Sequence, residues 1–302
     1  MKKNKENKKK RSKIFINYST KDFTMENLPH NRVEVFLDLL KSRWRVLLGV
    51  GAIMFLFSLP LIGSILGLNL ISSSLYASYL EGKIEAGVYH SNLFFLNIAF
   101  SLINLICLLI ISIPLSGIER VYKIMVYYEP LDFKADFFKG IKDNIVQTLV
   151  LSLVSSFVFT LSTILVTFLL SSGSKGFAST LAFFAPLFLF FIFILPSFLL
   201  STCSTPIYKN SLWVNFRNGF LLYFSTSLPT LGFCLIVIAP LFLLLLGNLY
   251  VILITLSLYF LIYFPLSFLC FYIYSTYVFD KCINKTSYPD LVDKGIYRIK
   301  KK

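Results

Sequence analysis

The hydropathy pattern divides the chain into long apolar runs separated by short polar segments. The longest run, residues 218–279, holds 62 residues without one Asp, Glu, Lys or Arg. A helix needs about 20 apolar residues to cross the hydrocarbon core of a bilayer, so this run is long enough for two crossings. Gly247-Asn248 is the polar break at which we expect the turn between them. The pattern therefore predicts an integral membrane protein.

Six such runs predict an all-α fold, a polytopic transmembrane bundle of six spans arranged as three hairpins. Each run is long enough for one tilted crossing. The expected spans are Val46–Ile71, Leu93–Leu115, Ile145–Leu170, Phe177–Leu200, Phe220–Leu246 and Leu249–Tyr274. The transmembrane domain then covers residues 46–274, between basic segments at 1–45 and 275–302. The loops at 117–144 and 201–219 are expected on the same side of the membrane as both termini.

The net charge of +14 is concentrated outside these spans. Of the 29 Lys and Arg residues, all but Lys83 and Lys175 fall in the terminal segments and the two loops just named. Because basic residues are retained on the cytoplasmic side, we expect a multi-pass protein of the cell membrane with both termini cytoplasmic. This distribution is typical of membrane topology and not of nucleic-acid binding.

The first 13 residues form a strongly basic run. Eight of them are Lys or Arg, against the single acid Glu6. Each basic residue near an anionic membrane surface contributes ~1 kcal/mol of attraction. We therefore expect this segment to contact anionic lipid.

The sequence offers no group of residues suited to catalysis. It contains no GxSxG, HExxH or P-loop pattern, and its five cysteines form no CxxC pair. The two histidines, His30 and His90, are expected on opposite sides of the membrane and so do not share a site. We predict a non-enzymatic protein without metal or cofactor.

The segment from Phe133 to Asp143 is amphipathic at helical spacing. Phe133, Phe137, Phe138 and Ile141 share one face, and Lys134, Asp136, Lys139, Lys142 and Asp143 share the other. Such a helix lies at the membrane interface, with its rings among the acyl chains and its charges in water. Two interpretations stay open: a snorkelling approach to the third span, or a docking helix for a membrane-protein partner. The docking interpretation assigns contacts to Phe133, Asp136, Phe137, Lys139 and Lys142.

A few polar residues fall inside the spans. Asn97 and Asn104 lie seven residues apart on one face of the second span, and the third span is rich in hydroxyls, including Ser155 and Thr163. These side chains either join neighbouring helices by hydrogen bonds or line a polar path. Prolines also recur, and kinks are expected where hydroxyls satisfy the freed carbonyls. They are Pro60, Pro114, Pro186, Pro196, Pro229 and Pro240.

The stretch from Ser112 to Leu151 resembles the bacterial YesL-like membrane proteins. These show a Leu-Pro near a span end, a Gly shortly after it, a basic segment with Tyr, and an FFxxxKxN-like helix that enters the next span. The residues at the corresponding places are Pro114, Gly117, Tyr122, Phe137, Phe138, Lys142 and Asn144. The resemblance covers about 40 of the 302 residues, and a whole hairpin precedes it. It implies an accessory role in carbohydrate uptake and supplies no catalytic residue.

Two functions therefore remain. The first is a non-enzymatic accessory component of a transport system, which contacts a membrane-protein partner through the 133–143 segment. The second is a permease or pore for neutral or lipid-like substrates, with proline-kinked helices around a cavity. The second function predicts a continuous polar path through the bundle, and a bundle packed solid between its helices would exclude it.

Overall fold

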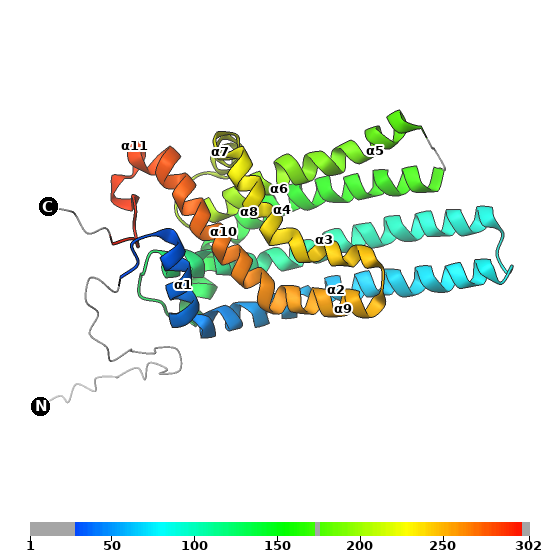
Figure 1. Cartoon of the computed structure of the whole chain (residues 1–302), viewed down its shortest axis with the longest axis horizontal. Coiled ribbons are helices and arrows are strands. Elements are labelled where there is room, and N and C mark those ends of the chain that lie inside the picture. The colour runs from blue at the N-terminus through cyan, green and yellow to red at the C-terminus, as the bar shows by residue number, and fades with distance from the viewer. Residues whose placement is uncertain (1–27, 173–175, 298–302) are drawn as a thin grey trace, which may run out of the picture.

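The computed structural model describes residues 28–172 and 176–297, which form helices joined by short turns, with no strand among them. Six of these helices are long and apolar enough to cross a membrane, which confirms the predicted number of spans. They run side by side as three hairpins (Figure 1). The expected all-α transmembrane bundle is therefore confirmed. The basic run 1–13, expected to contact anionic lipid, lies outside the described residues.

The three hairpins have the following bounds. The first consists of α2 (Trp44–Leu80) and α3 (Ala86–Val126). The second consists of α4 (Phe133–Ser172), α5 (Phe177–Leu189), the π-helical turn η3 (Phe190–Ile194) and α6 (Leu195–Ser204). The third consists of α8 (Ser227–Ile238), the 3-10 segment η4 (Ala239–Leu246), α9 (Leu249–Leu258), the π-helical turn η5 (Tyr259–Tyr263) and α10 (Phe264–Phe279).

The remaining helices lie at one end of the bundle. They are α1 (Arg32–Ser42), α7 (Leu212–Ser225), the π-helical turn η6 (Asp280–Asn284), α11 (Lys285–Ser287) and the short 3-10 turn η7 (Pro289–Leu291). We call this end, which carries residues 28 and 297, the base of the bundle. The opposite end, with the turn at 81–85, is the tip (Figure 1).

The helices of the first two hairpins are longer than the apolar runs that predict them. Helix α2 continues nine residues past Ile71, and α3 continues 11 residues past Leu115. The expected loop 117–144 therefore shrinks to residues 127–132, and Phe133–Asp143 forms the first three turns of α4. Hydropathy marks the limits of the apolar surface, and a helix does not have to end there. The extension of α3 is mostly buried, whereas that of α2 is exposed or half-buried. Side chains such as Ser72, whose Oγ donates to the Leu68 carbonyl, are compatible with continued helix.

The fifth span begins at Ser227, and the expected start at Phe220 is wrong. Residues 220–225 belong to α7, and Thr226 interrupts the helix with φ −139° and ψ 36°. Pro229 explains the break, because it has no N–H to donate to the carbonyl of Ser225 and is tolerated in the first turn of a new helix.

The expected turn at Gly247-Asn248 is confirmed. Gly247 has φ +66°, a conformation that glycine adopts without strain. The Asn248 side chain then accepts hydrogen bonds from the N–H groups of Tyr250 and Val251, at 2.9 and 3.3 Å, and so caps α9.

The tightest packing lies at the base, around α10. Phe268, Phe271, Tyr272 and Phe279 of this helix are fully buried. Arg32 of α1 is ion-paired with Asp280, and the N–H of Tyr297 donates to the carbonyl of Pro29 at 2.9 Å. These contacts join the two ends of the described chain.

A hydrogen bond also joins α1 to the turn after α3. The Tyr128 hydroxyl donates to Asp38 Oδ2 at 2.8 Å. Burial raises the pKa of Tyr128, and the bond to the Asp38 carboxylate raises it further. Tyr128 therefore stays a neutral donor, and the bond persists, throughout the physiological pH range.

Helices α2 and α3 approach their neighbours through glycines. A Cβ atom on Gly51 of α2 would overlap the carbonyl oxygen of Leu261 in η5, and one on Gly117 of α3 would meet the Phe137 ring at 2.7 Å. By contrast, a Cβ on Gly63, also in α2, has nothing within 4 Å. The two glycines of α2 therefore allow a matched test of this packing.

We predict that Gly51→Ala destabilises the protein by ~1–3 kcal/mol, because the added methyl group forces α2 away from a backbone atom. Gly63→Ala is the control, and its methyl group should cost nothing and gain up to ~1 kcal/mol from helix propensity. Thermal unfolding of the purified proteins in detergent measures the difference. Equal midpoints for the two variants would contradict the close approach of α2 to η5.

Candidate ligand cavity

A half-open cavity of about 390 Å³ lies between the three hairpins. Its wall is almost entirely apolar and is formed by residues of all six spans. Small-molecule sites in proteins have volumes of roughly 300–1,000 Å³. The cavity is therefore large enough for an organic ligand.

Helix α3 lines the cavity along one stripe. Its lining residues are spaced four, three, one and three residues apart, which places them on one face of the helix. They are Asn104, Leu108, Ile111, Ser112 and Leu115. The stripe covers 12 residues, and its ends are ~16 Å apart at a rise of 1.5 Å per residue. The cavity therefore extends along about half the thickness of a bilayer core, which is ~30 Å.

Two of the π-helical turns, η3 and η5, form parts of the cavity wall. Phe190 and Phe191 of η3 line it on one side, and Tyr259 and Phe260 of η5 line it on another. A proline follows each turn: Pro196 after η3, and Pro265, which the sequence analysis does not single out, after η5. Because proline has no N–H, the helix needs a local rearrangement before it, and a π turn provides one. The same backbone feature therefore occurs twice around one cavity.

Few polar atoms face this space. Asn104 Oδ1 is buried and has no hydrogen-bond partner among the described residues. Two of the lining serines donate to carbonyls of their own helix: Ser112 to Leu109 and Ser156 to Ser152, each at 2.6 Å. The wall therefore presents mainly hydrocarbon, and Asn104 contributes an acceptor that is buried without a partner among the described residues.

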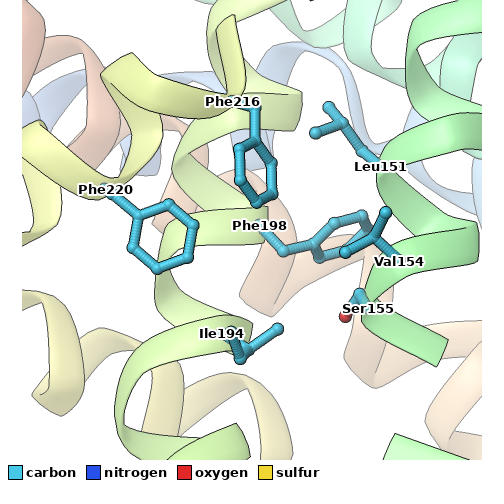
Figure 2. A pocket seen from close by; sticks show the side chains of 7 residues that line it. All are labelled: Leu151, Val154, Ser155, Ile194, Phe198, Phe216 and Phe220. Atoms are coloured by element: carbon cyan, nitrogen blue, oxygen red, sulfur yellow. The ribbon is translucent and has the colours of Figure 1, made fainter. Parts of the chain in front are cut away.

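A second, much smaller recess lies beside the cavity, on the side of α6 and α7. Figure 2 shows the seven side chains around it, with Leu151, Val154 and Ser155 of α4 facing phenylalanines of α6 and α7. Its volume is about 10 Å³, which is no more than one water molecule needs. Ser155 belongs to the walls of both spaces.

The four polar residues singled out from the spans separate into two pairs. Asn104 and Ser155 line the cavity. Asn97 Nδ2 instead donates to the Leu93 carbonyl at 2.8 Å, and Thr163 Oγ1 donates to the Thr160 carbonyl at 2.8 Å. Both bonds stay within one helix. The structure therefore brings only Asn104 and Ser155 together at one site.

The five residues assigned to partner docking do not share one surface. Phe133 is partly buried, and Phe137 is buried against Gly117. Asp136 accepts a hydrogen bond from the Asp132 N–H at 2.9 Å and lies 3.7 Å from Arg120 Nε. Of the five residues, only Lys139 and Lys142 are exposed. Docking at this segment stays a prediction, and these two lysines are its accessible residues.

The sequence analysis missed the most unusual polar residue of the bundle. Glu119 lies in α3, within the segment expected as a loop, and its side chain is fully buried. Thr148 Oγ1 donates to its Oε2 at 3.1 Å, while Oε1 has no partner among the described residues. The helical spacing of Ser112 and Leu115 could have identified Glu119. It follows Leu115 by four residues and so lies on the same face if the helix continues.

Comparison with protein-family models, with curated proteins and with solved structures finds no match to the chain. The resemblance to the YesL-like proteins therefore stays an expectation. The described residues define a class of protein by their fold and cavity alone: a six-span α-helical membrane protein with an apolar space inside the bundle.

Proposed function

We propose that the protein is a non-enzymatic membrane protein that binds a lipid-like molecule in the cavity. The observation that supports this most strongly is the 390 Å³ apolar space inside a six-span bundle. A hydrocarbon chain is the ligand that such a wall fits, because each buried CH₂ group contributes ~0.8 kcal/mol. Of the two functions predicted from the sequence, this is the permease or pore, and we restrict its substrates to lipid-like molecules.

The composition of the wall argues against a carbohydrate as the bound ligand. A sugar carries a hydroxyl on nearly every carbon, and each hydroxyl that is buried without a partner costs ~1–3 kcal/mol. The wall offers Asn104 and a few serines, two of which donate to their own helix. These groups are too few to satisfy a sugar.

A bulky side chain in the cavity should exclude the ligand. Ser155→Phe places a ring in the cavity and should lower the occupancy of a photoactivatable long-chain alcohol by about tenfold, which corresponds to ~1.4 kcal/mol. The protein is reconstituted in nanodiscs, irradiated with the probe, and digested. Mass spectrometry then counts labelled cavity residues.

Leu153→Phe is the matched control, because Leu153 lies on the same helix and is 41% exposed on its outer side. It should leave cavity labelling unchanged. Two results would contradict binding of a lipid-like molecule in this cavity. One is that the probe labels only outward-facing residues of the wild type. The other is that it labels the cavity residues of Ser155→Phe as much as those of the wild type.

We also propose that both termini are cytoplasmic. The positions of the basic residues support this orientation. Among the described residues, Lys83 is the only Lys or Arg at the tip. The others belong to elements at the base. Because basic residues are retained in the cytoplasm, the base is the cytoplasmic end.

Cysteine labelling in intact cells tests this orientation. Cys282 at the base is exposed, whereas Cys107, Cys203 and Cys234 are buried. A membrane-impermeant maleimide should modify Cys282 only after the cells are permeabilised. In a Cys282→Ser background, Lys83→Cys at the tip should be modified without permeabilisation. Modification of Cys282 in intact cells would reverse the proposed orientation.

A role as accessory component of a transport system, including carbohydrate uptake, is the second candidate function. Phe138, which is 59% exposed, lies beside the exposed Lys139 and Lys142 on the first turns of α4. An exposed aromatic ring and two exposed lysines on the same turns of a helix suit contact with an acidic partner. Asp136 and Phe137 hold the fold together there and leave these three residues for the partner.

A charge reversal tests docking without breaking an internal contact. Lys139→Glu with Lys142→Glu should remove a specific partner from material purified in mild detergent, because both charges become repulsive to an acidic surface. Lys281→Glu with Lys285→Glu is the control, since both of these lysines are also exposed at the base. Identical partner lists for wild type and the first variant would contradict docking at this segment.

A further inference from the structure

Below the cavity, at its base end, lies a layer of four buried polar residues. We call Glu119, Thr148, Cys203 and Tyr272 the polar floor, and each of their side chains is fully buried. They come from α3, α4, α6 and α10. None of them lines the cavity itself.

The polar floor is in register with the cavity wall on all four helices. Glu119 follows the lining residue Leu115 by four residues, Cys203 follows Leu199 by four, and Tyr272 follows Phe268 by four. On α4, which runs in the opposite direction, Thr148 precedes the lining residue Ser152 by four. Four residues are one helical turn, or ~6 Å. The cavity therefore ends one turn above a polar layer.

Three of the four side chains belong to helices that run from the tip to the base. Side chains of an α-helix lean toward its N-terminus, which for α3, α6 and α10 is the direction of the cavity. Glu119, Cys203 and Tyr272 therefore lean toward the space above them.

Two polar atoms of this floor are unsatisfied. Glu119 Oε1 and the Tyr272 hydroxyl are both buried and have no hydrogen-bond partner among the described residues. Tyr122, one turn after Glu119, meets the Tyr272 ring edge-on at 6.2 Å. The two unpaired groups therefore lie on two helices, α3 and α10, that pack against each other.

No described Lys or Arg supplies the charge that Glu119 lacks. Its neighbour Arg120 lies 3.7 Å from Asp136 and 3.6 Å from Asp143, on the other side of α3. A buried carboxylate without a cation is costly, and inside a membrane such a residue marks a ligand or ion site. A cationic group would pair with the ionised carboxylate and satisfy its free oxygen.

We propose that Glu119 binds the head group of the ligand, and that this ligand is a hydrocarbon chain ending in an ammonium group. The chain fills the apolar cavity, and the ammonium group donates to Glu119 Oε1 and to the Tyr272 oxygen. A single hydrogen bond, from Thr148, holds the Glu119 carboxyl, so its movement toward the cavity costs only ~1 kcal/mol. An ion pair at low dielectric is far stronger than one in water.

The inference rests on the proposed function, and two probes separate the two claims. A photoactivatable long-chain primary amine is compared with the alcohol of the same chain length, in nanodiscs of zwitterionic lipid. Both chains fit the cavity, but only the amine supplies a charge to Glu119. Cavity labelling as a function of probe concentration gives the apparent affinity of each.

The wild-type protein should bind the amine about tenfold to a hundredfold more tightly than the alcohol. This is the gain in affinity expected from one charge-assisted hydrogen bond. Glu119→Gln keeps the shape of the side chain and an acceptor for Thr148, and it should abolish this preference while the alcohol binds as before. Ser116→Ala is the control: Ser116 is buried one turn from Glu119 and donates only to the Ile113 carbonyl. It should leave both affinities unchanged.

Equal affinity for amine and alcohol in the wild type, or an unchanged preference in Glu119→Gln, would overturn the role of Glu119 while the cavity remains a lipid site. An equal loss of both probes in Glu119→Gln would also overturn it, because the residue would then only support the packing. If neither probe labels the cavity of the wild type, the proposed function fails, and the inference fails with it.

Discussion

The structure depends on one constraint: in hydrocarbon, every backbone N–H and C=O must find its partner within the protein. Helices satisfy this locally, and hydroxyls such as that of Ser58, which donates to the Phe55 carbonyl at 2.8 Å, add bonds near the interior Pro60. The same constraint explains the π turns η3 and η5, each of which precedes a proline that cannot donate. A wider turn changes the direction of the side chains around it. The cavity wall therefore includes two places where the regular α-helix is interrupted.

Packing differs sharply between the base and the middle of the bundle. At the base, α10 is buried on almost every side, and α1, α3 and α6 surround it. One turn above the polar floor the helices leave a half-open cavity between them instead. The buried Asn215 at the base is satisfied by several partners. Glu119, below the cavity, and Asn104, along it, each have an oxygen without a partner among the described residues.

The fold was largely predictable from the sequence, because lipid imposes a strong and simple pattern. Six apolar runs became six spans, and the turn at Gly247-Asn248 formed where a glycine and a capping asparagine coincide. The helix limits were less predictable: hydropathy ends where lipid ends, while α3 continues past Leu115 by packing against other helices. For that reason Glu119 was read as a loop residue. Asn104 and Ser155 were found because polar residues stand out within apolar runs, but the shape of the cavity around them depends on tertiary packing, which a single sequence does not encode locally.

The contacts between α1 and α10 have a consequence for biosynthesis. Arg32 leaves the ribosome some 250 residues before its partner Asp280, so the ion pair between α1 and the last span cannot form while the first two hairpins are being inserted. Chains grow at roughly 5–20 residues per second, which leaves α1 without its partner for tens of seconds. The base is therefore completed after translation of the last span, and a chain truncated before α10 lacks the helix around which the core at the base assembles.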